Sequence, residues 1–195
     1  MSYFVLKTQA TADGGYIESY PRNSPADWRF DEGTSLIREF PRRAAIQFSD
    51  NYPDARRLYD FQTNILSAMI VSGRVRKILE SLEITNAEYL PVAVKNHKGE
   101  VVAEDYAFVN LVGAEDAIDA EKSIYEMDSL AKDQIGWLKK LAIKESGIRP
   151  ESKMFRCTMD RRLILIREDV LAAFQKEGLT GFAVYKAEGW DGFEI

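Results

Sequence analysis

The chain has 195 residues, of which 46% are hydrophobic and 29% are charged, and its formal net charge is −5. This is ordinary globular composition with enough apolar residues for a core, and the acidic balance argues against general nucleic-acid binding. No apolar run approaches the roughly 20 residues that span a bilayer, and no secretory signal pattern opens the sequence, so we expect neither a membrane span nor export.

Short apolar segments alternate with polar loops in the N-terminal third. Two of them predict strands, at residues 3–6 and 44–48. At residues 27–36, Trp28 and Phe30 alternate with charged residues, which predicts an extended segment with both rings pointing inward. Apolar residues at helical spacing predict a helix over residues 54–67.

The middle and the end of the chain echo each other. Residues 69–94 and 164–185 both predict a short apolar strand, a helix and a second apolar strand. The apolar stripe of each helix falls at corresponding positions, Val75 and Leu79 in the first copy and Val170 and Phe174 in the second. Polar residues do not correspond between the copies, so we interpret the echo as a shared scaffold rather than a duplicated site.

The sequence offers one capping residue for each expected helix. Ser72 stands at the N-cap position of the first helix, where its hydroxyl could accept a hydrogen bond from a free backbone N–H. Gly178 follows the second helix, expected at residues 168–176, at the C′ position that requires left-handed backbone.

Further strands are expected around the two copies, at residues 101–103, 106–112, 137–143 and 154–158. Acids near the start of residues 115–122 predict a short helix there. Because strands outnumber helices, we predict an α+β fold with a mixed, mostly antiparallel sheet, a few packed helices and two strand–helix–strand units. We expect a single domain over residues 1–195, in which residues 1–60 could form a subregion packed on the remainder.

The sequence offers few groups for catalysis or metal binding. His97, the only histidine, lies in an expected turn, where a solvated residue is more common than a base or ligand. Cys157, the only cysteine, lies in an apolar strand and is expected in the core; it excludes an internal disulfide and favours a cytoplasmic location. We find neither a zinc-ligand pattern nor a glycine-rich phosphate loop, and we predict no cofactor and no metal.

Two groups of residues are candidates for a partner-binding surface. The first is a set of aromatic residues for which core packing is the default expectation, Trp28, Phe30, Trp137, Trp190 and Phe193. The second is an acidic stretch, because residues 100–133 hold ten acids and two lysines. Such a stretch could attract a basic partner if it lies on one surface, whereas ordinary solvated faces are the alternative.

Within the acidic stretch we take four carboxylates as the candidate partner-binding residues, Glu115, Asp116, Asp119 and Glu121. The same oxygens could hold a hard cation such as Mg²⁺. Their spacing fits no known cation loop, however, and a solvated helix face is the stronger alternative.

Eight short segments follow one another over nearly the whole chain: YFVL (3–6), WRFDEG (28–33), VSGRVRKILE (71–80), YLPVAV (89–94), YAFVN (106–110), DAEKS (119–123), MFR (154–156) and GLTGF (178–182). In this order they resemble a bacterial family of immunity proteins from polymorphic toxin systems, immunity protein family eleven, formerly a domain of unknown function. Residues 37–66 and 127–153 carry no matching segment.

The resemblance implies a non-enzymatic inhibitor that resides in the cytoplasm of the producing cell and binds a cognate toxin, often covering its active site. Two alternatives remain open. The acid cluster could serve a carboxylate- or metal-dependent enzyme. A deep apolar pocket with convergent polar groups would favour a small-molecule sensor or regulatory module.

Overall fold

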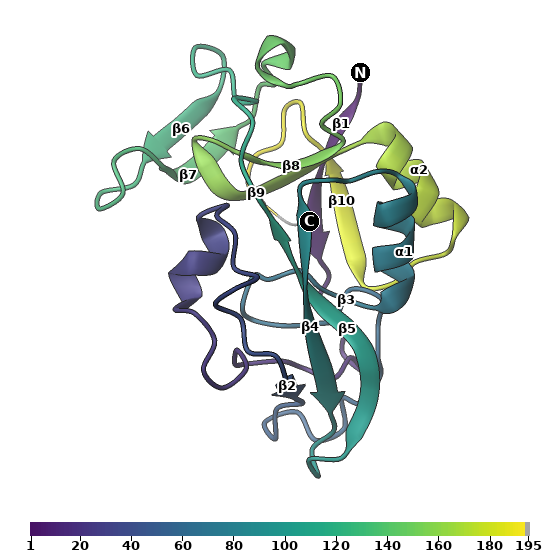
Figure 1. Cartoon of the computed structure of the whole chain (residues 1–195). Helices are drawn as coiled ribbons and strands as arrows, with labels where there is room; N and C mark the ends of the chain where they lie inside the picture. Colours follow the sequence, from purple (N-terminus) through teal and green to yellow (C-terminus); the bar gives the residue numbers. More distant parts are fainter. Residues whose placement is uncertain (194–195) are drawn as a thin grey trace.

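The computed structural model describes residues 1–193 (Figure 1). Within these residues the chain forms ten strands, two α-helices and two short 3₁₀ helices. In chain order they are β1 (Tyr3–Thr8), η1 (Asp27–Asp31), β2 (Ala44–Gln47), β3 (Ile70–Val71), α1 (Gly73–Ser81), β4 (Ala87–Lys95), β5 (Val101–Leu111), β6 (Ile124–Met127), β7 (Ile135–Lys140), η2 (Glu145–Gly147), β8 (Met154–Cys157), β9 (Asp160–Arg167), α2 (Glu168–Lys176) and β10 (Phe182–Lys186).

The strands form two four-stranded sheets and one hairpin. Strands β10, β1, β9 and β8 make the first sheet in that order, and every pair in it is antiparallel. Strands β2, β4, β5 and β3 make the second sheet, in which β2 and β4 run parallel. Strands β6 and β7 pair only with each other. The prediction of an α+β fold with mixed, mostly antiparallel sheets is confirmed.

Each strand–helix–strand unit is split by a strand from elsewhere in the chain. Strands β9 and β10 flank β1 and run antiparallel to it, and β3 and β4 flank β5 in the same way. The two strands of a unit are therefore parallel to each other, and the helix makes the crossover between them. The echo in the sequence thus corresponds to two units of the same topology.

Helices α1 and α2 lie side by side on one flank of the molecule (Figure 1). The corresponding apolar residues of both helices are fully buried in one hydrophobic cluster, Val75, Leu79, Val170 and Phe174. Removing an apolar side chain of this size from water contributes about 1.5–3 kcal/mol. The two units therefore stabilise each other through one shared core.

Residues 54–67 do not form the expected helix. Their backbone bonds to distant segments instead, since the N–H of Phe61 donates to the Thr180 carbonyl and the N–H of Gln62 donates to the Ile70 carbonyl. The adjacent residues Phe61 and Gln62 are both fully buried. Their side chains point to opposite sides of an extended segment, so both can be buried when that segment lies between two layers. The helix prediction was wrong because helical spacing of apolar residues arose by coincidence in an extended connector.

Residues 115–122 do not form a helix either. Glu115 makes a parallel bridge to Cys157, and Ile118 makes an antiparallel bridge to Ile143. Ala117 and Ile118 are both buried, which fits a segment held between two neighbours and not a solvated helix. The acids near the start of this segment bind side chains and backbone of other segments, as described below.

Three local expectations are also corrected. Residues 27–31 form a 3₁₀ helix rather than a strand, so Phe30 is buried while Trp28 is 62% exposed. Trp137 is 51% exposed and is not a core residue. Ser72 does stand at the N-cap of α1, but its hydroxyl accepts no backbone N–H of the helix; it is oriented toward the buried Asp60 carboxylate, to which it donates at 2.7 Å. Gly178 takes its expected left-handed conformation.

Candidate functional site

The acidic stretch of residues 100–133 does not lie on one surface. Glu100, Glu104 and Asp105 belong to the β4–β5 hairpin, which forms one end of the molecule (Figure 1). The remaining acids lie near β6 and β7, at the other end. The condition for one attractive acidic face is therefore not met, and each end has to be considered separately.

Glu115 is a buried structural acid. Its carboxylate accepts hydrogen bonds from the backbone N–H and the Nε of Arg149 and from the Ser152 hydroxyl, at 3.2, 2.8 and 2.7 Å, and it lies 2.6 Å from a second guanidinium nitrogen. Burial alone would raise its pKa, but the hydrogen bonds from Arg149 and Ser152 outweigh burial and hold the pKa below its ordinary value. These contacts fix the loop before β8.

Two further acids of the candidate set also have close partners. Asp116 forms an ion pair with Lys144. Asp119 accepts the backbone N–H of Glu121 and of Lys122 at 3.2 Å each and pairs with the Lys122 ammonium at 2.8 Å, and the Lys122 hydrogen bond lowers its pKa. Glu121 is exposed, and no hydrogen bond or ion pair engages its carboxylate in residues 1–193. Of the four candidates, Glu121 therefore has the carboxylate that a partner could reach most directly.

Metal binding gains no support from this arrangement. Across the described residues, no group of three or more histidine, cysteine, aspartate or glutamate side chains converges in a way that could hold a metal ion. His97 lies in the β4–β5 turn, where its Nε2 is 3.1 Å from the Tyr52 carbonyl oxygen. Cys157 is fully buried as expected, and burial raises the pKa of its thiol far above the ordinary value.

Residues 124–140, which we call the β6–β7 arm, project from the molecule (Figure 1). Ile135 and Leu138 attach the arm by packing into the hydrophobic cluster beneath it, and the N–H of Ile135 donates to the Met159 carbonyl at 2.6 Å. Tyr125 packs partly against the same cluster, and four large apolar side chains of the arm are exposed, Ile124, Met127, Leu130 and Trp137. Four exposed apolar side chains in one projecting hairpin make the arm a candidate interaction surface.

The tip of the arm is an ordered turn. The Asp128 carboxylate accepts the backbone N–H groups of Leu130 and Ala131 at 2.8 and 2.9 Å, and these bonds lower its pKa. The turn presents Leu130 with 93% of its surface exposed. Farther along the arm, the Lys139 ammonium lies 4.8 Å from the Trp137 ring centroid and pairs with Glu126 at 2.5 Å.

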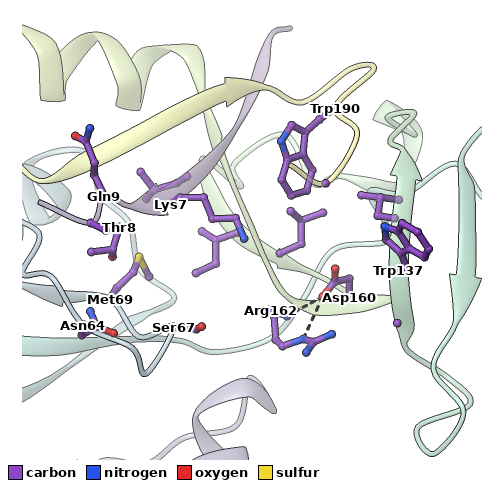
Figure 2. A pocket seen from close by; sticks show the side chains of 17 residues that line it. Lys7, Thr8, Gln9, Asn64, Ser67, Met69, Trp137, Asp160, Arg162 and Trp190 are labelled. Carbon is purple, nitrogen blue, oxygen red and sulfur yellow. Dashed lines mark hydrogen bonds and ion pairs between the residues drawn. The ribbon is translucent and has the colours of Figure 1, made fainter. Parts of the chain in front are cut away.

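A cleft of about 450 Å³ adjoins the arm (Figure 2). We call it the β1–β9 cleft, and its principal side chains come from four parts of the chain, Lys7, Trp137, Asp160, Arg162 and Trp190. Figure 2 shows the two indole rings at one end and the Lys7 amine reaching toward the same space. The cleft has the volume of ordinary ligand pockets, which span about 300–1,000 Å³.

The charges of the cleft are unevenly paired. The Lys7 Nζ lies 5.4 Å from the Trp190 ring centroid. The Arg162 Nε lies 3.9 Å from the nearest Asp160 carboxylate oxygen, beyond ordinary hydrogen-bond distance. The Asp160 side chain is only 16% exposed, and burial raises its pKa, an effect that the positive charge of Arg162 only partly offsets. Two cations thus face the cleft with one poorly exposed acid.

The cleft was not predicted from the sequence. Lys7 follows the apolar run of β1 and Arg162 precedes the apolar run of β9, and cations are common at such positions. Trp137 was expected in the core, but its apolar neighbours, Ile135 and Leu138, are the residues that pack beneath the arm, and the indole itself faces outward. The β1–β9 pairing brings these positions together, and sequence spacing does not reveal that pairing.

Behind the cleft, Arg156 is a buried structural cation. Its guanidinium donates to the carbonyl oxygens of Leu111, Arg161 and Phe30 at 3.2, 2.6 and 2.7 Å. Three separate segments are therefore joined at one side chain, and burial lowers its pKa.

Among the described residues no helix is long and apolar enough to cross a membrane.

Comparison with known proteins agrees with the resemblance seen in the eight short segments. No curated protein matches the chain. The family model described as Immunity protein family (Imm11) matches residues 2–189, which include both split units, the β6–β7 arm and most of the cleft. The chain therefore belongs to the Imm11 immunity protein family.

Proposed function

We propose that this chain is an immunity protein that binds a cognate bacterial toxin and neutralises it by protein–protein contact. Membership of the Imm11 family supports the immunity role. The observation that carries the binding mode is the β6–β7 arm, whose exposed apolar side chains stand beside a charged cleft. We further propose that residues 1–195 act as a single immunity-type domain in the cytoplasm of the producing cell, without a catalytic role.

The arm and the cleft have the features of a binding surface with a few strong anchors. Tryptophan and arginine are the residues that most often dominate the energy of an interface, and Trp137 and Arg162 lie at the junction of arm and cleft. The Ile135 and Leu138 contacts hold the arm in place before binding, which limits the entropy lost on association. Such a surface suits inhibition by tight, preorganised contact.

The four candidate acids have a secondary place in this proposal. Glu115, Asp116 and Asp119 support binding indirectly, by fixing the loops beside the arm through their pairs with Arg149, Lys144 and Lys122. Glu121 contributes at the rim, where a charge mainly changes the association rate.

Co-expression tests the proposed function. The toxin domain encoded by the adjacent reading frame is expressed in a sensitive strain with and without this chain, and the pair is then purified. We expect growth to be restored and the two proteins to copurify. If the toxin kills cells equally fast in the presence of the folded chain and no complex forms, the proposal is wrong.

The volume of the β1–β9 cleft favours one second candidate, a small-molecule sensor. A thermal-shift screen with nucleotides, amino acids and carboxylic acids tests it with the protein alone. A concentration-dependent rise in the unfolding temperature that Arg162→Ala abolishes would support the sensor. No shift across the screen would remove it.

A further inference from the structure

The strongest unassigned feature is the excess of positive charge in the lining of the β1–β9 cleft, where Lys7 and Arg162 stand against Asp160. Arg167, on the same strand as Arg162, has a close carboxylate partner in Asp169 at 2.7 Å. Within residues 1–193, no carboxylate lies within 4 Å of the Lys7 ammonium, and the Asp160 carboxylate is 3.9 Å from Arg162. Lys7 is therefore the cation of the cleft without a close carboxylate, and the lining holds two positive charges and one negative charge, a balance that favours an anion.

The walls of the cleft add an apolar requirement. Trp137 is half exposed, and the Trp190 ring stacks on Tyr185 with its centroid 6.5 Å away while its indole N–H donates to the Phe193 carbonyl at 3.2 Å. The Trp190 ring is thus fixed in place, and Trp137, over whose ring Lys139 lies, offers the larger exposed apolar area. A ligand that fits this cleft combines a negative charge with an apolar neighbour.

We propose that the β1–β9 cleft is the anchor site for the toxin and that it receives an acidic residue of the toxin, whose carboxylate meets Lys7 and Arg162 while an adjacent apolar side chain packs on Trp137. This inference rests on the proposed function and specifies its partner chemistry. The occupant is a loop or extended segment, because the cleft has room for more than one side chain.

The charge balance distinguishes this occupant from a basic one. A basic toxin side chain could stack on the indole rings, but it would have to approach Lys7 and Arg162, and the one acid in the lining, Asp160, is poorly exposed. Like charges at a desolvated contact oppose binding, whereas an acid gains two charge-assisted hydrogen bonds. The two occupants therefore predict opposite effects of charge reversal.

The test measures binding of the full chain to an inactivated form of the toxin domain from the adjacent reading frame, by calorimetry. Lys7→Glu and Arg162→Glu are each expected to weaken binding by roughly 30-fold or more, as loss of a desolvated charge partner does. Lys98→Glu is the matched control, since Lys98 is exposed in the β4–β5 turn at the other end of the molecule and makes the same charge change. It is expected to leave affinity nearly unchanged.

Two further measurements keep the outcome clear. Lys7→Gln and Arg162→Gln, with thermal unfolding of every variant, separate lost binding from lost folding. Replacing the acids of the toxin one at a time by lysine should identify one position that restores binding to Lys7→Glu. The anchor proposal would be overturned if the wild-type chain bound tightly and both reversal variants bound equally well or more tightly; the proposed function would then remain intact. The proposed function itself would be overturned if the wild-type chain did not bind the toxin.

Discussion

Asp60 and Thr180, 120 residues apart in the sequence, are joined by three hydrogen bonds. The Asp60 carboxylate accepts the backbone N–H and the hydroxyl of Thr180 at 3.1 and 3.0 Å, and the Asp60 N–H donates to the Thr180 hydroxyl at 3.2 Å. The same carboxylate accepts the Ser72 hydroxyl, at the start of α1, and an Arg74 guanidinium N–H. One buried acid thus connects the helix start of one split unit with the loop that leads from α2 to β10 in the other.

Asp60→Ala is expected to destabilise the protein by about 3 kcal/mol, because it leaves the Thr180 N–H and two hydroxyls without their acceptor in a buried site. Chemical denaturation monitored by circular dichroism measures the change. Asp54→Ala is the control, since Asp54 is exposed in a neighbouring loop, and it should change stability by less than about 0.5 kcal/mol. Equal effects of the two substitutions would show that Asp60 does not couple the units.

Glu115 makes stability depend on pH. Its pKa is lower in the folded protein than the ordinary value of 4.5, so its contribution is fully present above that pH and is lost as the pH falls toward the folded pKa. The free energy of unfolding should therefore be larger for the wild type than for Glu115→Gln at neutral pH. The difference between the two proteins should shrink below pH 4.5. Denaturation series between pH 3 and pH 7 check this, and a margin independent of pH would contradict it.

Trp137 and Leu138 are adjacent in β7 but have opposite roles. Leu138→Ala should lower stability by about 2–5 kcal/mol because this side chain is buried beneath the arm. Trp137→Ala should change stability by less than about 0.5 kcal/mol yet weaken toxin binding by about 2 kcal/mol or more. Trp28→Ala, at another exposed tryptophan, on η1, serves as the binding control. It should change neither the stability nor the toxin affinity appreciably. Toxin affinity unaffected by Trp137→Ala would remove the arm from the interface.

Gly181 precedes β10 in a left-handed conformation, with φ of 83°. A Cβ at this position would collide with the carbonyl oxygen of Phe61, so Gly181→Ala requires backbone movement in addition to strained φ. Gly178 also has positive φ, 59°, but a Cβ there meets nothing within 4 Å. We expect Gly178→Ala to cost about 1 kcal/mol and Gly181→Ala clearly more, by thermal and chemical unfolding. Similar losses at both positions would mean that the Phe61 carbonyl yields easily.

Both split units could be predicted from the sequence because their strands and helices carry regular apolar periods. Val75 with Leu79 and Val170 with Phe174 mark the two helices correctly. The failures at residues 54–67 and 115–122 have one cause: these segments are held by distant partners, and their apolar residues follow those partners rather than a helical period. The sequence alone does not contain the positions of those partners.

The cleft escaped prediction for a related reason. Lys7 and Arg162 are ordinary surface residues when each strand is considered alone, and they become a site only where β1 lies beside β9. The four acids at residues 115–121 were visible because they are close together in sequence, yet three of them serve local structure. Proximity in the sequence therefore shows which acids lie together but not which distant cations they pair with, such as Lys144 and Arg149.

The position of β1 between β9 and β10 sets an order of assembly during synthesis. The β3–α1–β4–β5 unit has all of its strands as soon as β5 has been translated, whereas β1 must wait until β9 and then β10 follow. The first sheet can therefore be completed only after β10 has been synthesised, and the hydrophobic cluster that both sheets share is completed with it. The cleft that we assign to the toxin is therefore the final part of the molecule to appear, and a nascent chain that stops before β9 offers no anchor.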